Sequence, residues 1–305
     1  MKGAVIWIYI FSLLMASPGC SNGNDEPTDK FNSGTIHISC DESFKPVIDA
    51  QIQVYTADYP DANIIVHYKP EAECLRDFYT DSIRLVIATR GFTDGERVKI
   101  LDSTGIGPDK FTVARDAIAV IVHPGAKDSF FTIQEIRDLV TGKHKKNLIP
   151  VFDGLSATST VRFMLDSVLQ GENLGPNVVA AQSSEAVIEY VSKVPNAVGF
   201  IGVSWVANKE DTTQRTFLKK IRIAHLESTD SSDAYVQPVQ YLIYTNSYPL
   251  IRDLVYVVKE NHQGLGKGFG NFLKSERGQL IFRRAYLQPV IRPFYIRNAE
   301  LEEEY

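Results

Sequence analysis

Short runs of β-forming residues alternate along this chain with segments of helical periodicity. Thr35 to Cys40 (TIHISC) predicts a strand, and the segment from Pro46 to Tyr59 then places its apolar residues on one helical face. Asn63 to Tyr68 and Ile83 to Thr89 predict two further strands, again separated by a helical pattern. Because parallel strands need a long crossover between them, this alternation predicts an α/β fold with a mainly parallel sheet.

Two β-like runs are longer than a typical strand: Phe111 to Val122 (FTVARDAIAVIV) and Tyr235 to Tyr244 (YVQPVQYLIY). A second set of strands and helices lies between them. Such runs can carry the chain into a second domain and back, and 305 residues are enough for about two domains. We therefore expect lobe one to comprise residues 34–115 and 241–305, and lobe two residues 116–240.

The chain carries 32 basic and 37 acidic residues, a formal charge of −5. A general nucleic-acid binder needs a basic surface to neutralise phosphates, so this class is excluded. An anionic ligand remains possible, but local dipoles and a few placed cations would have to hold it.

Three strand-to-helix loops are suited to holding an anion in this way, and they are Asp41 to Phe44, Lys69 to Glu71 and Ser156 to Thr160. Free amides and hydroxyls at a helix N-terminus bind anions without net positive charge. In open α/β sheets, ligands lie beyond the carboxyl ends of the strands. The alternative for each Ser or Thr is an ordinary helix cap.

The N-terminus has the three parts of a secretory signal peptide in residues 1–19: Lys2, the apolar stretch Ala4 to Ala16, and small residues before Cys20. Small residues before a cysteine are also typical of a bacterial lipobox, so Cys20 is the expected lipidation site. The alternative is a secreted protein with an incidental cysteine. Residues 20–33 are polar and predict a lipid-anchored flexible tether. We expect a cell-envelope protein, periplasmic or surface-exposed.

The remaining cysteines, Cys40 and Cys74, fit no metal-binding spacing, which leaves one disulfide or two buried thiols, with the thiols favoured. The histidines His37, His67 and His123 are scattered among predicted strands without ligand spacing. No metal or other cofactor is therefore expected. A hydrolase has little support, because the sequence lacks a nucleophile elbow, a zinc-protease motif and a P-loop.

Several segments together resemble a known family. They are DESFKP, LVIATRGFTDGE, VARDAIAVIVHP, FTIQEIRDLVTGK, STVRF, PNAVGFIGVSWV and YTNSYPLIRDLVYVV. In this order, over nearly the whole chain after residue 33, they resemble the phosphate-binding proteins of Pst-type ABC importers, in the lipoprotein branch common in Bacteroidetes. The resemblance implies a type II periplasmic-binding-protein fold: two α/β lobes, two hinge crossovers, and a ligand cleft between the lobes.

The resemblance also implies binding residues. The first-loop hydroxyl and aromatic pair of the family matches Ser43 and Phe44. Its Ser/Thr motif at a later helix start matches Thr158, Ser159 and Thr160. These side chains are expected to converge on one cleft from both lobes.

Three family positions differ in this chain. The serine of the family's second loop falls on Pro70, so that contact is lost or moves to Glu71. The family's aspartate after the third strand falls on Thr89 or Arg90, and its arginine before the hydroxyl loop falls near Phe152 or Asp153.

We therefore expect Arg90 to supply the cation, while Asp153 or Asp41 accepts a proton of the ligand. The alternative is that Arg90 and Asp153 pair across the cleft. Arg162, one turn into its helix, is expected at the surface; the alternative is that it reaches the cleft.

The implied function is the capture of inorganic phosphate by a monomeric, non-catalytic lipoprotein, which delivers it to an ABC permease. The alternative is a receptor for another oxyanion, or a signalling or surface-adhesion paralogue.

Overall fold

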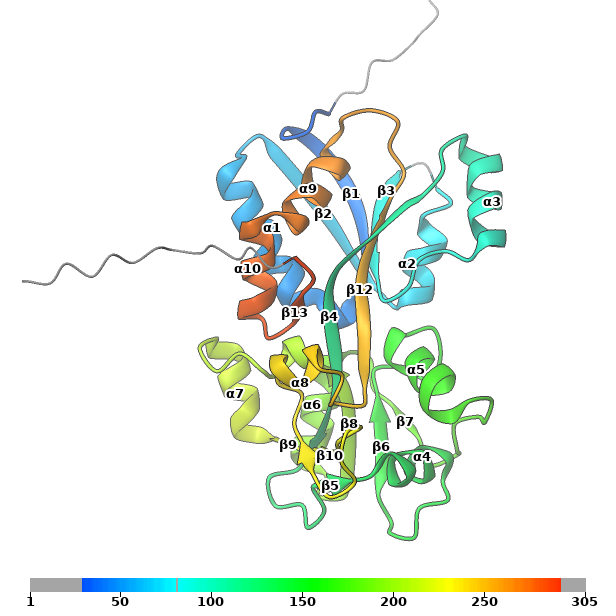
Figure 1. Ribbon diagram of the computed structural model, residues 1–305, viewed down its shortest axis with the longest axis vertical. Helices are drawn as coiled ribbons and strands as arrows, with labels where there is room; N and C mark the ends of the chain where they lie inside the picture. Colours follow the sequence, from blue (N-terminus) through cyan, green and yellow to red (C-terminus); the bar gives the residue numbers. More distant parts are fainter. Residues whose placement is uncertain (1–28, 81, 292–305) are drawn as a thin grey trace, which may run out of the picture.

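The computed structural model describes residues 29–80 and 82–291 and has two α/β halves, one above the other in Figure 1. Two long strands join the halves: β4 (Asp109–Val122) and β12 (Ile251–Val258). We call the upper half lobe one and the lower half lobe two. The predicted α/β class is confirmed.

Lobe one is built around the carboxyl end of strand β1, where the chain turns directly into helices. The strands β1 and β2 are parallel, as are β1 and β3, so the predicted strands of this region are confirmed. The elements are β1 (Gly34–Asp41), η1 (Glu42–Phe44), α1 (Lys45–Asp58), β2 (Ala62–Lys69), α2 (Glu71–Asp77), β3 (Ile83–Ala88), α3 (Asp94–Thr104), α9 (Leu265–Lys274), α10 (Glu276–Arg284) and β13 (Gln288–Pro289).

Lobe two has a buried central strand, β8, with parallel β6 beside it. Thr132 and Glu135 form a capping box at the start of α4. The elements are β5 (Phe130–Phe131), α4 (Ile133–Thr141), β6 (Ile149–Phe152), α5 (Ser159–Phe163), the π-helix η2 (Met164–Leu169), β7 (Val179–Ala180), α6 (Ser184–Lys193), β8 (Ala197–Gly202), η3 (Val203–Trp205), α7 (Thr212–Lys220), β9 (Arg222–Ile223), β10 (His225–Glu227), β11 (Tyr235–Val236) and α8 (Gln240–Tyr244).

One mixed sheet runs through both lobes in the order β2-β1-β3-β12-β4-β8-β6-β7. The first part of β4 pairs with antiparallel β12, and its last part pairs with β8 in lobe two. The predicted long run from Phe111 to Val122 is thus one strand that serves both lobes. A separate small sheet has the order β11-β10-β5.

The prediction of a second extended run over Tyr235 to Tyr244 is wrong. Only Tyr235 and Val236 are in a strand, and Gln240–Tyr244 is helix α8. Pro238 lies between the two elements and has no N–H for a strand ladder, so the extended run stops there. The strand that returns the chain to lobe one is β12.

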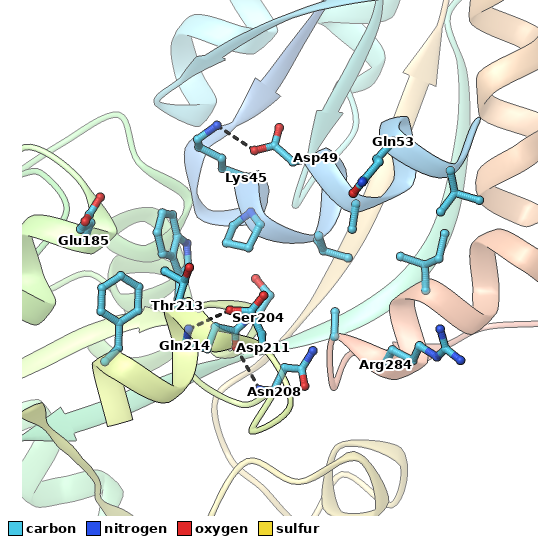
Figure 2. Close-up of a pocket in the computed structure, with 18 residues that line it drawn as sticks. Lys45, Asp49, Gln53, Glu185, Ser204, Asn208, Asp211, Thr213, Gln214 and Arg284 are labelled. Atoms are coloured by element: carbon cyan, nitrogen blue, oxygen red, sulfur yellow. Dashed lines mark hydrogen bonds and ion pairs between the residues drawn. The ribbon is translucent and has the colours of Figure 1, made fainter. Parts of the chain in front are cut away.

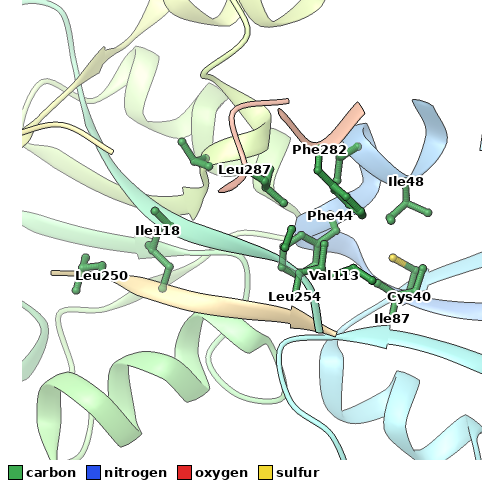
Figure 3. Packing of buried hydrophobic residues seen from close by; sticks show 14 of the residues in the cluster. Cys40, Phe44, Ile48, Ile87, Val113, Ile118, Leu250, Leu254, Phe282 and Leu287 are labelled. Atoms are coloured by element: carbon green, nitrogen blue, oxygen red, sulfur yellow. The ribbon is translucent and has the colours of Figure 1, made fainter. Parts of the chain in front are cut away.

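A continuous hydrophobic core lies along the two connecting strands (Figure 3). Phe44 and Phe282 pack in it from lobe one, next to Val113 of β4 and Leu254 of β12. Ile118 extends the same core toward lobe two. Burial of these side chains supplies the main stabilisation of the fold.

Residues 29–33, the last five of the predicted tether, are described by the structure and lie against lobe one. Both oxygens of Asp29 accept from the Arg84 guanidinium, at 2.9 and 2.8 Å, and Oδ2 also accepts from the backbone N–H of Leu265 at 2.7 Å. The Tyr55 hydroxyl donates to the Phe31 carbonyl. Asp29 and Phe31 therefore attach this segment to lobe one.

The signal-peptide segment and Cys20 lie outside the described residues. Within the described ranges, no helix combines the length and apolarity needed to cross a membrane. Cys40 and Cys74 are buried free thiols, which is the favoured of the two predicted states.

Candidate functional site

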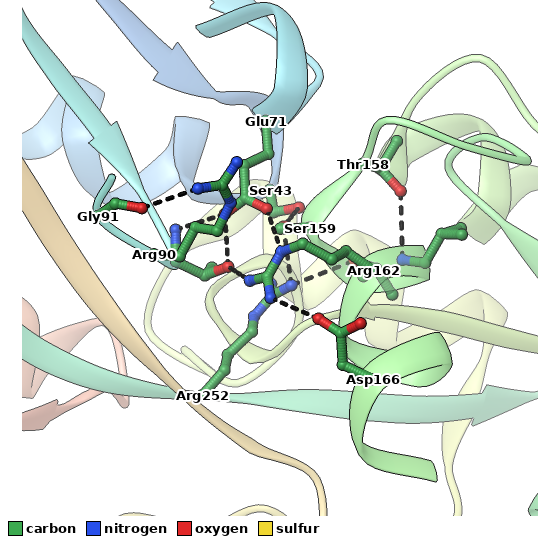
Figure 4. Close-up of polar contacts among 12 residues, drawn as sticks. Ser43, Glu71, Arg90, Gly91, Thr158, Ser159, Arg162, Asp166 and Arg252 are labelled. Atoms are coloured by element: carbon green, nitrogen blue, oxygen red, sulfur yellow. Dashed lines mark hydrogen bonds and ion pairs between the residues drawn. The ribbon is translucent and has the colours of Figure 1, made fainter. Parts of the chain in front are cut away.

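Polar side chains from both lobes meet between them (Figure 4). Each is buried, although it belongs to a residue type that usually stays in water. We call this group the buried polar cluster; it comprises Asp41, Ser43, Asp116, Asp153, Ser159, Thr160 and Arg252.

Local structure places the lobe-one part of the cluster. Asp41 is the last residue of β1, and its Oδ1 caps η1 by accepting from the Ser43 N–H at 3.0 Å. This cap turns the Ser43 hydroxyl toward lobe two, where its Oγ lies 3.4 Å from Asp153 Oδ2 and 3.4 Å from Ser159 Oγ. The Ser43 carbonyl accepts from the Trp205 indole at 3.0 Å. The first predicted loop therefore contacts lobe two directly.

The lobe-two part lies at the start of α5. Asp153 follows strand β6, and Thr158 caps the helix by accepting from the Val161 N–H. Ser159 and Thr160 are its first two residues, so their amides and hydroxyls lie at the positive end of the helix.

Arg252 joins the two parts. Its Nε donates to Asp116 Oδ2 at 2.8 Å, and its Nη1 donates to Ser159 Oγ at 2.9 Å and to Thr160 Oγ1 at 3.3 Å. The guanidinium carbon lies 5.1 Å from the centre of the Phe44 ring. The cluster thus has a buried cation on the strand that connects the lobes.

Four polar atoms of the cluster are buried without a hydrogen-bond partner among the described residues: Asp41 Oδ2, Asp116 Oδ1, Asp153 Oδ1 and Arg252 Nη2. Unpaired buried polar atoms cost free energy and are uncommon in folded proteins. Here three acceptors and one cationic donor lie in a single cluster. This combination suits a small ligand that carries both negative charge and O–H groups.

Burial raises the pKa of all three carboxyls of the cluster. For Asp41, burial and the nearby charge of Glu71 outweigh Arg252 and raise the pKa to about 7. Burial raises the pKa of Asp116 and of Asp153 against the opposing effect of Arg252 and of hydrogen bonds. Carboxyls of the cluster can therefore be protonated at neutral pH, and a protonated carboxyl donates a hydrogen bond as well as accepting one.

A second group lies at the edge of the cluster and consists of Glu71, Thr89 and Arg162 (Figure 4). Glu71 accepts from the backbone and hydroxyl of Thr89 at 2.8 and 2.6 Å, and from Arg162 Nε at 2.6 Å. Arg162 also donates to the Thr89 hydroxyl at 2.6 Å. The side chain of Arg162, expected at the surface, instead crosses from lobe two to lobe one.

The structure brings most of the predicted binding residues together. Ser43, Asp153, Ser159 and Thr160 belong to the cluster, Phe44 packs against Arg252, Thr158 caps α5, and Glu71 and Thr89 lie beside the cluster.

Arg90, the cation that the sequence suggested, has other partners. It donates to Glu96 at 3.0 Å and to the Gly91 carbonyl at 2.9 Å. Glu96 is fixed in turn by the capping box of α3, which it forms with Thr93. Arg90 is thus paired within lobe one.

Sequence reasoning missed Arg252 and Asp116. A signal existed, because each charged residue directly adjoins an apolar β-like run, AIAVIV after Asp116 and LVYVV from Leu254 shortly after Arg252. A charge at such a position is almost always paired when it is buried. Their pairing with each other, however, depends on strand register.

A cavity of about 540 Å³ lies on another side of the lobe interface (Figure 2). Lys45 and Asp49 of α1 and Arg284 of α10 line it from lobe one, and Asp211 and Phe217 line it from lobe two. It adjoins the buried polar cluster through Ser204 and Trp205, which both donate to the Ser43 carbonyl. Both lobes therefore form its walls.

Comparison with known proteins gives a family match. A family model described as PBP superfamily domain matches residues 25–277. The chain is 22% identical over 277 residues to the phosphate-binding protein PstS of Staphylococcus saprophyticus, which covers 86% of this chain and 81% of that protein.

Solved structures share the fold. A phosphate ABC transporter substrate-binding protein with bound phosphate, from Clostridium perfringens, superposes with a TM-score of 0.71 at 22% identity, covering 85% of this chain and 100% of that one. An ABC-type phosphate transport receptor from Vibrio cholerae superposes with a TM-score of 0.62 at 17% identity, covering 83% and 99%. The two-lobed arrangement is thus that of known binding proteins.

Proposed function

Because the chain belongs to the PBP superfamily, we propose that it is a non-catalytic binding protein that captures inorganic phosphate between its two lobes. The observation that carries this proposal is the unpaired Nη2 of buried Arg252 beside three unpaired carboxylate oxygens. The names of the relatives from Staphylococcus, Clostridium and Vibrio support phosphate as the ligand.

The charges of the cluster favour a protonated oxyanion. Arg252 Nη2, the Ser43 hydroxyl and the start of α5 supply donors for phosphate oxygens. Asp153 or Asp41 accepts a hydrogen bond from the P–OH group of the ligand. Sulfate has no proton at neutral pH, so a carboxylate facing it must either stay unpaired or take up a proton from solvent, and both cost free energy that monohydrogen phosphate avoids.

In this proposal Arg252 takes the role that the sequence suggested for Arg90. Arg252 is buried and contacts both the connecting strand β4 and the start of α5. Arg90 is about a third exposed and paired with Glu96. Ser43, Ser159 and Thr160 remain proposed ligand contacts.

Binding can be measured by isothermal titration of the phosphate-stripped protein with phosphate, arsenate and sulfate. We expect phosphate and arsenate to bind with similar affinity, and sulfate at least about a hundredfold more weakly, because only sulfate lacks the proton. Equal binding of sulfate would exclude the proton-acceptor site, and binding of none of the three would exclude an oxyanion receptor. Hydrolysis of a phosphate ester would favour an enzyme instead.

We further propose that the protein hands phosphate to an ABC permease from the outer side of a membrane, to which a lipid on Cys20 anchors it. Cys20 follows small residues after a short apolar segment, which supports a lipobox. Cells that express Cys20→Ala should yield a precursor or soluble protein without palmitate label. Unchanged labelling and membrane retention would contradict the anchor.

A receptor for another oxyanion, or a non-transport paralogue, is the second candidate. The observation in its favour is Pro70, which stands where the resembling family has a serine, with the carboxylate of Glu71 next to it. A titration in which another oxyanion binds more tightly than phosphate would support this candidate.

A further inference from the structure

Glu71 is almost completely buried at the start of α2, with its side chain 2% exposed. Its Oε1 accepts from the backbone N–H of Thr89 at 2.8 Å and from the Thr89 hydroxyl at 2.6 Å. Its Oε2 accepts from Arg162 Nε at 2.6 Å. Residues of this chain thus already occupy both carboxylate oxygens.

These contacts cross the lobe interface. Glu71 and Thr89 belong to lobe one, and Arg162 belongs to α5 of lobe two (Figure 4). Beside them, the Ala72 N–H donates to the Ala157 carbonyl at 2.9 Å, which is a second link between the lobes. Within its own lobe, Arg162 Nη1 donates to the exposed Asp166 at 3.1 Å, while Nε and Nη2 make the contacts to lobe one.

We propose that Glu71 and Arg162 form an interlobe clamp, which shifts the equilibrium between open and closed lobes toward the closed state. Glu71 then acts as a positioning residue and not as the ligand contact that the sequence suggested. The effect of the clamp on phosphate affinity rests on the proposed function, whereas its effect on lobe closure does not.

The chemistry of the group supports the clamp. Burial by itself raises the pKa of Glu71, but Arg162 and the two Thr89 donors outweigh burial and lower it. The carboxylate therefore stays charged beside the site, where an unpaired charge would repel an anion. Arg162 neutralises it only in the closed arrangement, so the pair favours closure.

Closure by the clamp has a consequence for binding. When a ligand binds only the closed state, its apparent affinity scales with the closed fraction of the free protein. Loss of the clamp should lower that fraction and speed release of the ligand.

The test compares Glu71→Gln and Arg162→Gln with the parent protein by small-angle scattering in phosphate-free buffer. Asp166→Asn is the matched control, because it removes a partner of Arg162 that does not touch lobe one. We expect the parent and the control to share one radius of gyration and both clamp variants to have a larger one. Stopped-flow release of phosphate should be about tenfold faster or more in the clamp variants.

The clamp is overturned if both variants have the same radius of gyration as the parent in phosphate-free buffer. Because Glu71 is buried, its variant is checked by circular dichroism. If Glu71→Gln is unfolded, the scattering of Arg162→Gln alone tests the clamp, because the Arg162 side chain is about a third exposed and its loss disturbs the core less. If the variants open but the parent fails to bind phosphate, the clamp stands and the proposed function falls.

Discussion

The Nε of Arg252 lies 2.8 Å from Oδ2 of Asp116, and the two residues face each other across the antiparallel strands β12 and β4. Both side chains are buried, at 2% and 0% exposure. A buried ion pair is favourable only when further hydrogen bonds satisfy its remaining atoms. Ser159 and Thr160 accept from Arg252 Nη1, so the pair links the connecting strands to helix α5. Arg252 Nη2 and Asp116 Oδ1 have no partner among the described residues, which leaves them for a ligand in the proposed function.

Arg252→Lys should weaken phosphate binding by about tenfold to a hundredfold, or roughly 1.5–3 kcal/mol. Lysine keeps the charge, but a single ammonium cannot contact Asp116, Ser159 and a ligand in the fixed geometry of a guanidinium. Isothermal titration measures the change. The control is Arg90→Lys, which should bind like the parent because Arg90 pairs with Glu96. Loss of binding in the control alone would return the cation role to Arg90.

Asp153→Asn should narrow the preference for phosphate over sulfate by about tenfold or more. The amide can turn its N–H toward sulfate, whereas the carboxyl of Asp153 must first take up a proton to donate a hydrogen bond to sulfate. Competition of sulfate with labelled phosphate in equilibrium dialysis measures the ratio. If Asp41→Asn narrows it and Asp153→Asn does not, Asp41 is the proton acceptor.

The stability of the phosphate-free protein should depend on pH through Asp41. Its pKa is raised from 3.8 to about 7 in the folded state, so folding favours the protonated form. The folded state binds more protons than the unfolded chain between these values, and its stability falls as pH rises from about 4 to about 7. The contribution is fully present below about pH 4.

Asp41→Asn removes this dependence while its Oδ1 can still cap η1. Relative to the parent, the variant should gain about 1–4 kcal/mol of unfolding free energy between pH 4 and pH 7.5. Urea titrations at the two pH values measure the gain. An equal difference between variant and parent at both values would show that Asp41 has an ordinary pKa.

Asp29→Asn should destabilise lobe one by about 1–2 kcal/mol at neutral pH. Burial by itself raises the pKa of Asp29, but hydrogen bonds from Arg84 and the Leu265 N–H outweigh it and lower the pKa to about 2. The carboxylate therefore stabilises the fold above about pH 4, and this stabilisation is lost as pH falls toward 2.

Thermal unfolding at pH 7 and at pH 3 tests the Asp29 prediction. The decrease in the unfolding midpoint caused by Asp29→Asn should be smaller at pH 3 than at pH 7. The exposed Asp166→Asn serves as a control and should change the midpoint little at either pH. If Asp29→Asn lowers the midpoint equally at both pH values, the charged form of Asp29 does not stabilise the fold.

The sequence by itself determined the features that depend on neighbours in the chain. Alternating strand and helix patterns predicted β1, β2 and β3 and the long strand β4, because side-chain periodicity follows local backbone geometry. The loops at Ser43 and at Thr158 to Thr160 were found because helix caps are local motifs.

The tertiary structure alone decided which charges meet. Arg252 and Asp116 are 136 residues apart and Arg162 and Glu71 are 91 apart, so strand register and lobe closure bring each pair together. A single sequence does not specify such distances between side chains. Arg90 shows the same limit, because its sequence position resembled a ligand site while Glu96, in the first turn of α3, was the nearer partner for its charge.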